Sequence, residues 1–320
     1  MPGTPMSTEA VGVARARRAA RPSSLRVALR DLAGRAVPVL TVVLVILAAW
    51  YAAAVGMNAD LQRQAFDNAG VTDAGFRDFA AGTWAQSHPR LPAPHQIAAE
   101  IGRSIFEVAP TSKRSLVYHA GVTLEATALG FLLGGVVGLL LSLMEVHVPS
   151  LDRGLMPWIV ASQTVPIVAL APMIVVILAQ VSVTGLLPKA IIAAYLSFFP
   201  VTVGMVKGLR SPEPLHLDLM RTYSASRPQV LRLLRLPASL PFLFASLKVG
   251  VAASLVGTVV AEVTKSEDGG LGARLLAGSY YGQTVQIWAA LVVAAVCGAA
   301  LVGLVSAIEA VVLRRMGAGR

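Results

Sequence analysis

Long runs of apolar residues constrain this chain more than any other feature of its sequence. Residues 37–57 are almost entirely apolar, and further runs of similar length follow between residues 118 and 313. A helix needs roughly 20 apolar residues to cross the hydrocarbon core of a bilayer. Only 14% of the 320 residues are charged, whereas soluble domains carry about 25%. We therefore expect an all-α polytopic membrane protein.

The apolar runs predict six transmembrane helices, at residues 37–57, 119–144, 155–180, 186–207, 239–263 and 286–312. Pro166 and Pro172 interrupt the third span. The first run is longer than the apolar region of a signal peptide, so we expect it to be retained. The predicted domains are a basic N-terminal tail (1–36), the first transmembrane helix (37–57), an external loop (58–117), a transmembrane core (118–313) with a polar loop at 210–236, and a C-terminus (314–320).

The distribution of Lys and Arg predicts the orientation of the chain. With the N-terminus inside, 17 of the 27 basic residues lie on the cytoplasmic side and 9 outside. Such an excess marks the cytoplasmic loops of membrane proteins. Both termini are therefore expected in the cytoplasm. The net charge of +10 is explained by this bias, so we expect no nucleic-acid partner.

Residues typical of catalytic or metal centres are sparse. Cys297 is the one cysteine and lies in an apolar run, and the five histidines are scattered without ligand spacing. The sequence contains no Gly-x-x-x-x-Gly-Lys-Ser/Thr phosphate loop. We expect neither a metal nor a cofactor, no enzymatic activity in this chain, and any ATP hydrolysis in a separate subunit.

The polar loop between the fourth and fifth spans predicts a short helix–turn–helix outside the bilayer. Ser226 and Gln229 have the spacing of a capping box, and Pro228 suits the first turn of the second helix. We expect Asp218 near the start of the first helix, where the helix dipole favours a negative charge. Pro237 is expected to end the second helix and to open the fifth span. A short amphipathic element of this kind is suited to docking on a soluble partner.

At this loop the chain resembles the permeases of binding-protein-dependent ABC importers with the type I fold. Their signature runs Glu-Ala-Ala, three residues, Gly, nine residues, Ile, one residue, Leu-Pro. Asp218, Leu219 and Met220 stand for Glu-Ala-Ala, and Ser224 stands for Gly. The remaining positions match at Leu234, Leu236 and Pro237. The resemblance implies that the loop couples to an ATPase, with contacts from Asp218, Leu219, Met220, Tyr223, Ser224, Ser226, Gln229 and Pro237.

Other segments resemble the nitrate, sulfonate and taurine branch of these permeases. They are the run from Leu91 to Pro94, the segment 163–172, and Glu262 followed by 269–272. The run from Tyr223 to Ser226 is similar to the subgroup that handles pyrimidine precursors. The resemblance implies import across a bacterial inner membrane, with two ABC ATPase subunits, an extracytoplasmic solute-binding protein and a second permease subunit, in contact with membrane lipid.

Polar and small residues inside the predicted spans raise separate hypotheses. Gln163, Thr164, Ser254, Thr258 and Glu262 either contact the solute or bridge helices. Glu262 is expected near the wet outer end of its span. Glu125 and Lys248 either pair or face a water-filled path, and Glu309 lies within reach of Arg314. The row Gly130, Gly134 and Gly138 predicts a close helix–helix contact.

Two other function classes remain open at this stage. An ion-coupled secondary transporter would usually show inverted repeats, which the sequence lacks. A structural subunit of a membrane complex is argued against only weakly by the polar span residues. Co-purification with an ATPase separates the importer permease from both.

Overall fold

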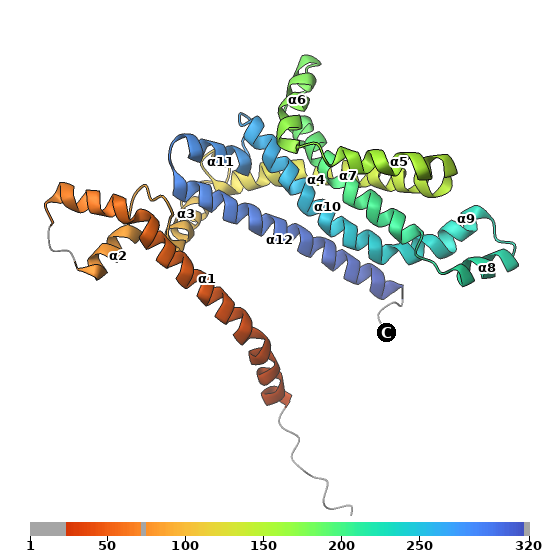
Figure 1. Cartoon of the computed structure of the whole chain (residues 1–320), viewed down its shortest axis with the longest axis horizontal. Coiled ribbons are helices and arrows are strands. Elements are labelled where there is room, and N and C mark those ends of the chain that lie inside the picture. Colours follow the sequence, from red (N-terminus) through yellow and green to blue (C-terminus); the bar gives the residue numbers. More distant parts are fainter. Residues whose placement is uncertain (1–23, 72–74, 317–320) are drawn as a thin grey trace, which may run out of the picture.

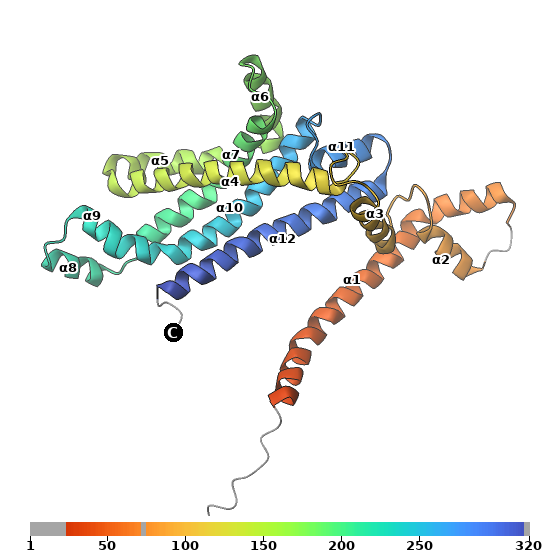
Figure 2. The ribbon, with the colours of Figure 1, turned by 180° about the vertical axis from the view of Figure 1, so that it is seen from behind.

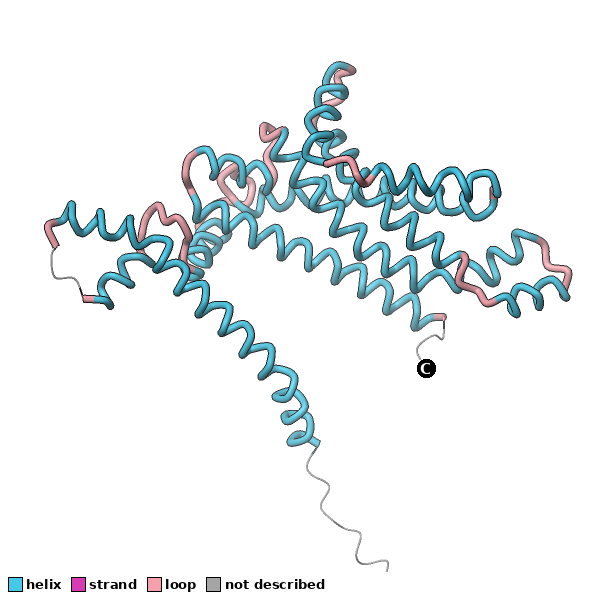
Figure 3. Tube along the Cα trace, in the orientation of Figure 1, coloured by secondary structure: helices cyan, strands magenta, loops and turns pink. Residues whose placement is uncertain are grey.

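The computed structural model describes residues 24–71 and 75–316, and over these ranges the chain is helical. Figure 3 shows that loops only connect one helix to the next. The helices are α1 (Ser24–Ala69), α2 (Phe76–Trp84), α3 (Pro94–Phe106), α4 (Leu116–His147), α5 (Pro149–Ser162), α6 (Ile167–Gln180), α7 (Leu186–Leu209), α8 (Pro214–Thr222), α9 (Arg227–Val230), α10 (Leu236–Thr264), α11 (Leu271–Tyr280) and α12 (Thr284–Arg315). A π-helical turn, Leu231–Arg235, joins α9 to α10.

Four long helices, α4, α7, α10 and α12, form the body of the molecule and lie side by side in both views (Figures 1 and 2). The pair α8 and α9 projects from one end of this body, and the other end carries α11 and α3. We name these the α8/α9 end and the α11 end. The body therefore has two chemically distinct ends separated by apolar helices.

The long apolar helices largely agree with the predicted spans. Five helices are long and apolar enough to cross a membrane, or six if α5 and α6 together count as one. The third predicted span is the exception, because α5 and α6 meet at 94°. Pro166 has extended backbone angles at the start of α6, and proline disfavours helix at the residue before it. The predicted interruption at Pro166 is thus present, as a sharp turn of the chain, whereas Pro172 lies inside α6 and does not interrupt it.

The first helix is longer than predicted at both ends. It begins at Ser24, within the predicted tail, and continues to Ala69, within the predicted external loop. Ala, Leu, Arg and Gln are strong helix formers; Ala, Leu and Arg are frequent in the first extension, and Ala and Gln in the second. The rest of the predicted tail lies outside the described residues. Between Val37 and Leu47 the large apolar side chains of α1 are exposed, and α1 points away from the body (Figure 1).

The second half of α1 packs with α2 and α3 into a cap at the α11 end. Asn58 is fully buried and connects the segments of this cap through hydrogen bonds. Its amide nitrogen donates to the carbonyls of Thr83 and Leu91 at 3.2 and 2.8 Å, and its oxygen accepts from the Arg90 N–H at 2.8 Å. The Trp50 ring contacts Trp288 of α12 edge-on, with centroids 4.9 Å apart. The cap is thereby tied to the body.

The predicted glycine row of α4 makes its close contact with α7. A Cβ atom at Gly134 would lie 2.1 Å from the Ser197 hydroxyl oxygen and 2.7 Å from the Ala194 carbonyl oxygen. The same test at Gly130 and Gly138 also meets α7 atoms at less than 3 Å. Small residues let helix backbones approach closely in lipid, where packing replaces the hydrophobic drive. The row is thus an intramolecular seam.

Glycines also bring α7 and α10 into close contact. A Cβ atom at Gly204 would overlap Ser246, and one at Gly208 would overlap Ser239. From the other side, a Cβ atom at Gly257 of α10 would lie 2.9 Å from the Ala193 backbone. Helices α4, α7 and α10 are therefore in backbone contact, and α7 lies between the other two.

We predict that Gly134→Ala destabilises the protein and that Gly135→Ala does not. The new methyl group at residue 134 meets the α7 backbone, and overpacking of this kind typically costs about 1–3 kcal/mol. At Gly135 an added Cβ meets nothing within 4 Å. Thermal unfolding of the two purified variants measures the difference. Equal melting temperatures for both variants and the parent would show that the seam is not close-packed.

Candidate functional site

The predicted helix–turn–helix is present at the α8/α9 end. After α7 ends at Leu209, the chain forms α8, turns at residues 223–226, and returns through α9 and the π-helical turn into α10. Figure 1 shows this pair projecting beyond the ends of α7 and α10. No residue of α8 or α9 is buried. The element is therefore free to contact another molecule.

Ser224 closes α8 in the conformation that usually requires glycine. Its φ is +52°, in the left-handed region that L-residues other than Asn and Asp rarely enter. The Ala225 N–H donates to the Met220 carbonyl at 3.0 Å, and the Ser224 N–H donates to the Arg221 carbonyl at 2.8 Å. These two bonds define a Schellman motif. The position matched to the signature glycine is thus the left-handed residue of the turn, here occupied by Ser.

The second helix begins with the predicted capping box. The Gln229 side-chain oxygen accepts the Ser226 N–H at 2.7 Å and the Ser226 hydroxyl at 3.0 Å. Pro228 lies in the first turn of α9, where its missing N–H removes no helical bond. The turn is therefore fixed on both sides, by the Schellman motif before it and by the box after it.

Pro237 does not end the second helix, contrary to the prediction. Helical structure continues from Arg227 to Thr264 without a break. Pro237 is the second residue of α10 and follows directly on the π-helical turn Leu231–Arg235. Proline removes one backbone donor, and a π-helical turn is one way in which the helical ladder adjusts locally. The second helix of the pair and the fifth predicted span are thus one continuous helix.

Asp218 lies in the middle of α8 rather than near its start, so that prediction was also wrong. Glu213 precedes the helix and Pro214 is its first residue, which places Asp218 beyond the first turn, where the dipole effect is small. Its carboxylate pairs with Arg221 at 2.8 Å on the helix surface. Exposed pairs of this kind contribute little to stability. The local charge of Asp218 is therefore already balanced.

An exposed apolar row runs along α8 and ends at the turn. Leu215, Leu219 and Tyr223 are 74%, 52% and 77% exposed, and their spacing of four residues places them on one face of a helix. Met220 is only half-buried. Sequence reasoning missed Leu215, although the spacing of four residues from Leu219 is visible in the sequence. Exposed apolar side chains gathered on one helix face suit a groove on a partner.

The polar residues of α10 face α4 and are fully buried. The Ser254 hydroxyl donates to the Thr127 carbonyl at 3.0 Å, and the Thr127 hydroxyl donates to the Thr258 hydroxyl at 3.1 Å. Glu262 is 0% exposed, so the expectation that it is wet was wrong. These three candidate residues, Ser254, Thr258 and Glu262, bridge helices in this structure, as the alternative interpretation expected.

Glu262 is held by a glycine-rich loop and by α4. The Thr123 hydroxyl lies 2.9 Å from both of its carboxylate oxygens, and the Gly272 N–H donates to one of them at 2.9 Å. The Leu271 N–H donates to the Thr123 hydroxyl at 2.8 Å. A Cβ atom at Gly270 would lie 2.1 Å from the carboxylate. Only glycine at residue 270 lets the backbone approach this closely, because its φ is +115° as well.

The same loop is fixed at two further points. The Lys189 side chain, which is almost fully buried, donates to the Gly269 carbonyl at 3.1 Å. The Gly270 N–H donates to His119 Nδ1 at 3.0 Å, so Nε2 of that ring carries the proton. His119 Nε2 then donates to the Lys113 carbonyl at 2.9 Å. Charged and polar groups from α4, α7 and α10 thus meet at the α11 end.

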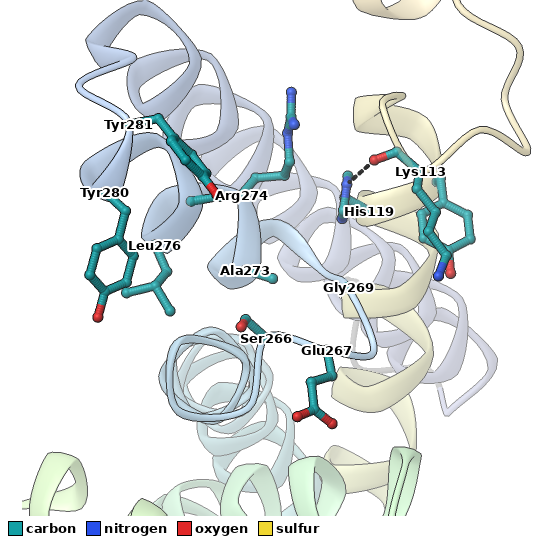
Figure 4. A pocket seen from close by; sticks show the side chains of 12 residues that line it. Lys113, His119, Ser266, Glu267, Gly269, Ala273, Arg274, Leu276, Tyr280 and Tyr281 are labelled. Atoms are coloured by element: carbon teal, nitrogen blue, oxygen red, sulfur yellow. Dashed lines mark hydrogen bonds between the residues drawn. The ribbon is translucent and has the colours of Figure 1, made fainter.

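A cavity of about 390 Å³ opens beside this loop. Figure 4 shows Lys113 and His119 on one side, Ser266 and Glu267 below, and Tyr280 and Tyr281 on the far side. The side chains of Tyr280 and Tyr281 are about three-quarters exposed. The α11 end therefore presents a polar and aromatic hollow, in contrast to the apolar row of α8.

Gln163 and Thr164 lie at the turn between α5 and α6 and are not buried. The Thr164 hydroxyl donates to the Ala161 carbonyl at 2.7 Å. The Tyr195 hydroxyl of α7 donates to the Ser162 carbonyl, which anchors the turn to the body. The structure therefore separates these two candidate residues from Ser254, Thr258 and Glu262, which lie in the α4–α10 contact.

The remaining charged residues of the spans pair differently from the predictions. Lys248 of α10 forms an ion pair with Glu309 of α12 at 2.5 Å, whereas Glu125 is exposed on α4. Glu309 therefore pairs with Lys248 rather than with Arg314, and Lys248 does not pair with Glu125. The position of Glu309 near the inner end of its span suggested Arg314 as its partner, but a charged group inside a membrane pairs with a group on a neighbouring helix.

The long apolar helices and the projecting helix pair define a class: polytopic membrane proteins with an exposed helix pair at one end. The chain belongs to the family of binding-protein-dependent transport system inner membrane components, whose family model matches residues 130–318. The predicted family, the all-α membrane fold and the permease class are thereby confirmed. The cap and the first helix lie outside the matched residues.

Three curated relatives are similar to this chain. A probable ABC transporter permease protein of Haemophilus influenzae is 33% identical over 159 residues, which is 50% of this chain and 63% of the relative. The formylaminopyrimidine transport permease protein of Halalkalibacterium halodurans is 30% identical over 56% of this chain and 67% of its own length. The riboflavin transport system permease protein of Chloroflexus aurantiacus is 30% identical, over 66% and 70%.

We predict that Thr123→Val lowers the stability of the protein, because it leaves the Glu262 carboxylate and the Leu271 N–H without the hydroxyl that both use. Loss of a buried partner costs about 1–3 kcal/mol. The matched control is Thr264→Val, whose exposed hydroxyl bonds only to a carbonyl of its own helix. Thermal unfolding tests the pair. If Thr123→Val melts with the control, the contact around Glu262 is not stabilising.

Proposed function

We propose that this chain is the membrane-spanning permease subunit of an ATP-driven importer. Helices α8 and α9 receive the motion of a separate ABC ATPase, and the body forms the solute pathway. The exposed row Leu215, Leu219 and Tyr223, held by a fixed turn at one end of a membrane bundle, supports this most strongly. A secondary transporter would have no occupant for this row.

The coupling surface consists of the first helix, the turn and the base of the second helix. Leu219 and Tyr223 enter a groove of the ATPase, and Met220 supports them from the half-buried side. Ser224, Ser226 and Gln229 set the angle between the helices. Asp218 and its partner Arg221 offer charges at the rim, and Pro237 lies where the docking helix enters the body.

The α8/α9 end is the cytoplasmic end in this proposal, with both termini in the cytoplasm of a bacterial cell. The excess of Lys and Arg on that side supports it. The solute-binding protein then docks at the α11 end. A cysteine replacing Ser226 is expected to react with an impermeant maleimide only in inverted vesicles, and one replacing Phe76 only in intact spheroplasts. The opposite pattern overturns the orientation.

A second permease subunit completes the pathway. The large apolar side chains of α1 from Val37 to Leu47 are exposed on a helix that points away from the body (Figure 1), and they suit a membrane partner as well as lipid. Gln163 and Thr164, at the turn between α5 and α6, are the residues placed to contact solute, whereas Ser254, Thr258 and Glu262 hold α10 against α4. Native mass spectrometry of the purified importer measures the number of permease chains.

We predict that Leu219→Ser with Tyr223→Ser abolishes the solute-stimulated ATPase activity of the purified complex and weakens assembly. Burial of one large apolar side chain contributes about 1.5–3 kcal/mol, so loss of both lowers ATPase affinity by at least two orders of magnitude. The control is Phe76→Ser, an equally exposed apolar side chain on α2. Stimulated activity at the parent level in the double variant excludes this surface as the coupling site. Solute uptake that survives deletion of the ATPase subunit would instead favour a secondary transporter.

A further inference from the structure

A second polar cavity lies at the α11 end, between the cap and the body. Its volume is about 320 Å³. Its walls come from α3, from the segment that follows α3, from α11 and from the start of α12. The residues that matter for its chemistry are Arg103, Arg114, Arg274, Glu100, Gln283 and Gln286. Part of this wall belongs to the residues outside the family match.

The charge of the cavity is strongly positive. Three arginines line it, and Glu100 is its one acidic lining residue. Glu100 pairs with Arg103 at 3.3 Å, so it balances one of the three positive charges. Within the described residues, Arg114 and Arg274 have no ion-pair partner. Two guanidinium groups therefore remain to be neutralised.

Of these two groups, Arg274 has the greater need for a hydrogen-bond partner. Its Nε atom is buried and has no hydrogen-bond partner within the described residues. A buried donor without a partner costs free energy. In Figure 4 its guanidinium points away from Ser266 and Glu267, and it lines the second cavity as well as the one shown there.

The electrostatics agree with this geometry. Burial lowers the pKa of Arg274, and the nearby Glu100 carboxylate opposes that shift. The charged form is thus penalised by desolvation, and only one acidic group helps to offset the penalty. A bound anion would supply the missing charge and accept the free N–H groups.

The amide groups of Gln283 and Gln286 add neutral donors. Neither side chain makes a hydrogen bond within the described residues, and both line the cavity. Guanidinium groups bind planar or tetrahedral oxyanions through paired N–H donors. Two unpaired guanidiniums with two amides therefore match a small oxyanion such as a sulfonate, sulfate or phosphate.

We infer that the cavity between the cap and the body binds a small oxyanion through Arg274 and Arg114. The recessed position of Arg274 favours a small ligand over an acidic side chain of a docked protein, because Arg274 is only partly exposed while Arg103 and Arg114 form the rim. The cavity lies at the opposite end from α8 and α9, so anion binding there can be measured on this chain without the ATPase.

Isothermal titration of the full chain with sulfate tests this site. The chain is held in phosphatidylcholine nanodiscs, without anionic lipid, at constant ionic strength set with sodium chloride. Sulfate is expected to bind with a stoichiometry of one and to raise the melting temperature. Dimethyl sulfone, a neutral molecule of similar shape, is expected not to bind.

Variants identify the binding groups. Arg274→Gln is expected to lower sulfate affinity at least tenfold, whereas Arg274→Lys keeps part of it. Arg63→Gln, which removes an exposed arginine of α1 that does not line the cavity, should leave affinity unchanged. A melting curve without sulfate shows whether each variant is folded. If Arg274→Gln unfolds, Arg114→Gln replaces it, with the same expected direction.

Three results would overturn the assignment. They are the absence of saturable sulfate binding, equal binding of dimethyl sulfone, and unchanged affinity in folded variants of both Arg274 and Arg114. If sulfate does not bind but Arg274→Gln weakens association with the loaded solute-binding protein, the guanidinium serves protein docking, and the oxyanion site is refuted.

Discussion

The backbone contact of α7 with α4 and α10 is the constraint on which the rest of the structure depends. Lipid supplies no hydrophobic drive between apolar helices, so their association relies on close packing and on hydrogen bonds. Glycines 130, 134 and 138 bring α4 onto α7, and glycines 204, 208 and 257 bring α10 onto it. At that separation the hydroxyls of Thr123, Thr127 and Ser254 reach across from one helix to the next. The hydrogen bonds between these helices therefore depend on the close packing of their backbones.

The sequence predicted those features whose signals are local. Apolar runs located the spans, the spacing of glycines predicted a close contact, and Ser226 with Gln229 predicted a capping box that the structure contains. The start of α8 also has a local signal, in Pro214 at its first position, whereas the prediction rested on the acidic Asp218. Ser224, matched to the signature glycine, has a positive φ, which is the conformation that glycine adopts most readily.

Other features depend on contacts that no local pattern encodes. Glu262 bonds to Thr123, which lies 139 residues away in the chain, and Lys189 bonds to Gly269 across 80 residues. The position of Glu262 near the end of its span suggested that its side chain contacts water, whereas the carboxylate is surrounded by α4 and a glycine-rich loop. The direction of the chain after Pro166 could not be predicted either, because proline predicts a break in the helix but not the 94° angle between α5 and α6. Lys248 and Glu309 form an ion pair between two helices. The spacing of residues within one helix gives no information about such a contact.

The unbroken helix from Arg227 to Thr264 has a mechanical consequence. Its 38 residues correspond to a length of roughly 57 Å at about 1.5 Å per residue. One extremity carries the helix that faces the ATPase in our proposal, and the other carries Glu262, which accepts hydrogen bonds from the Gly272 N–H and the Thr123 hydroxyl. Tilting such a rod by only about 5° displaces its far extremity by roughly 5 Å, given the length that follows from helix geometry. That exceeds the range of every hydrogen bond around the carboxylate. A small tilt of the helix at its Arg227 end would thus, by geometry alone, break or shorten the hydrogen bonds of Glu262 at the other end.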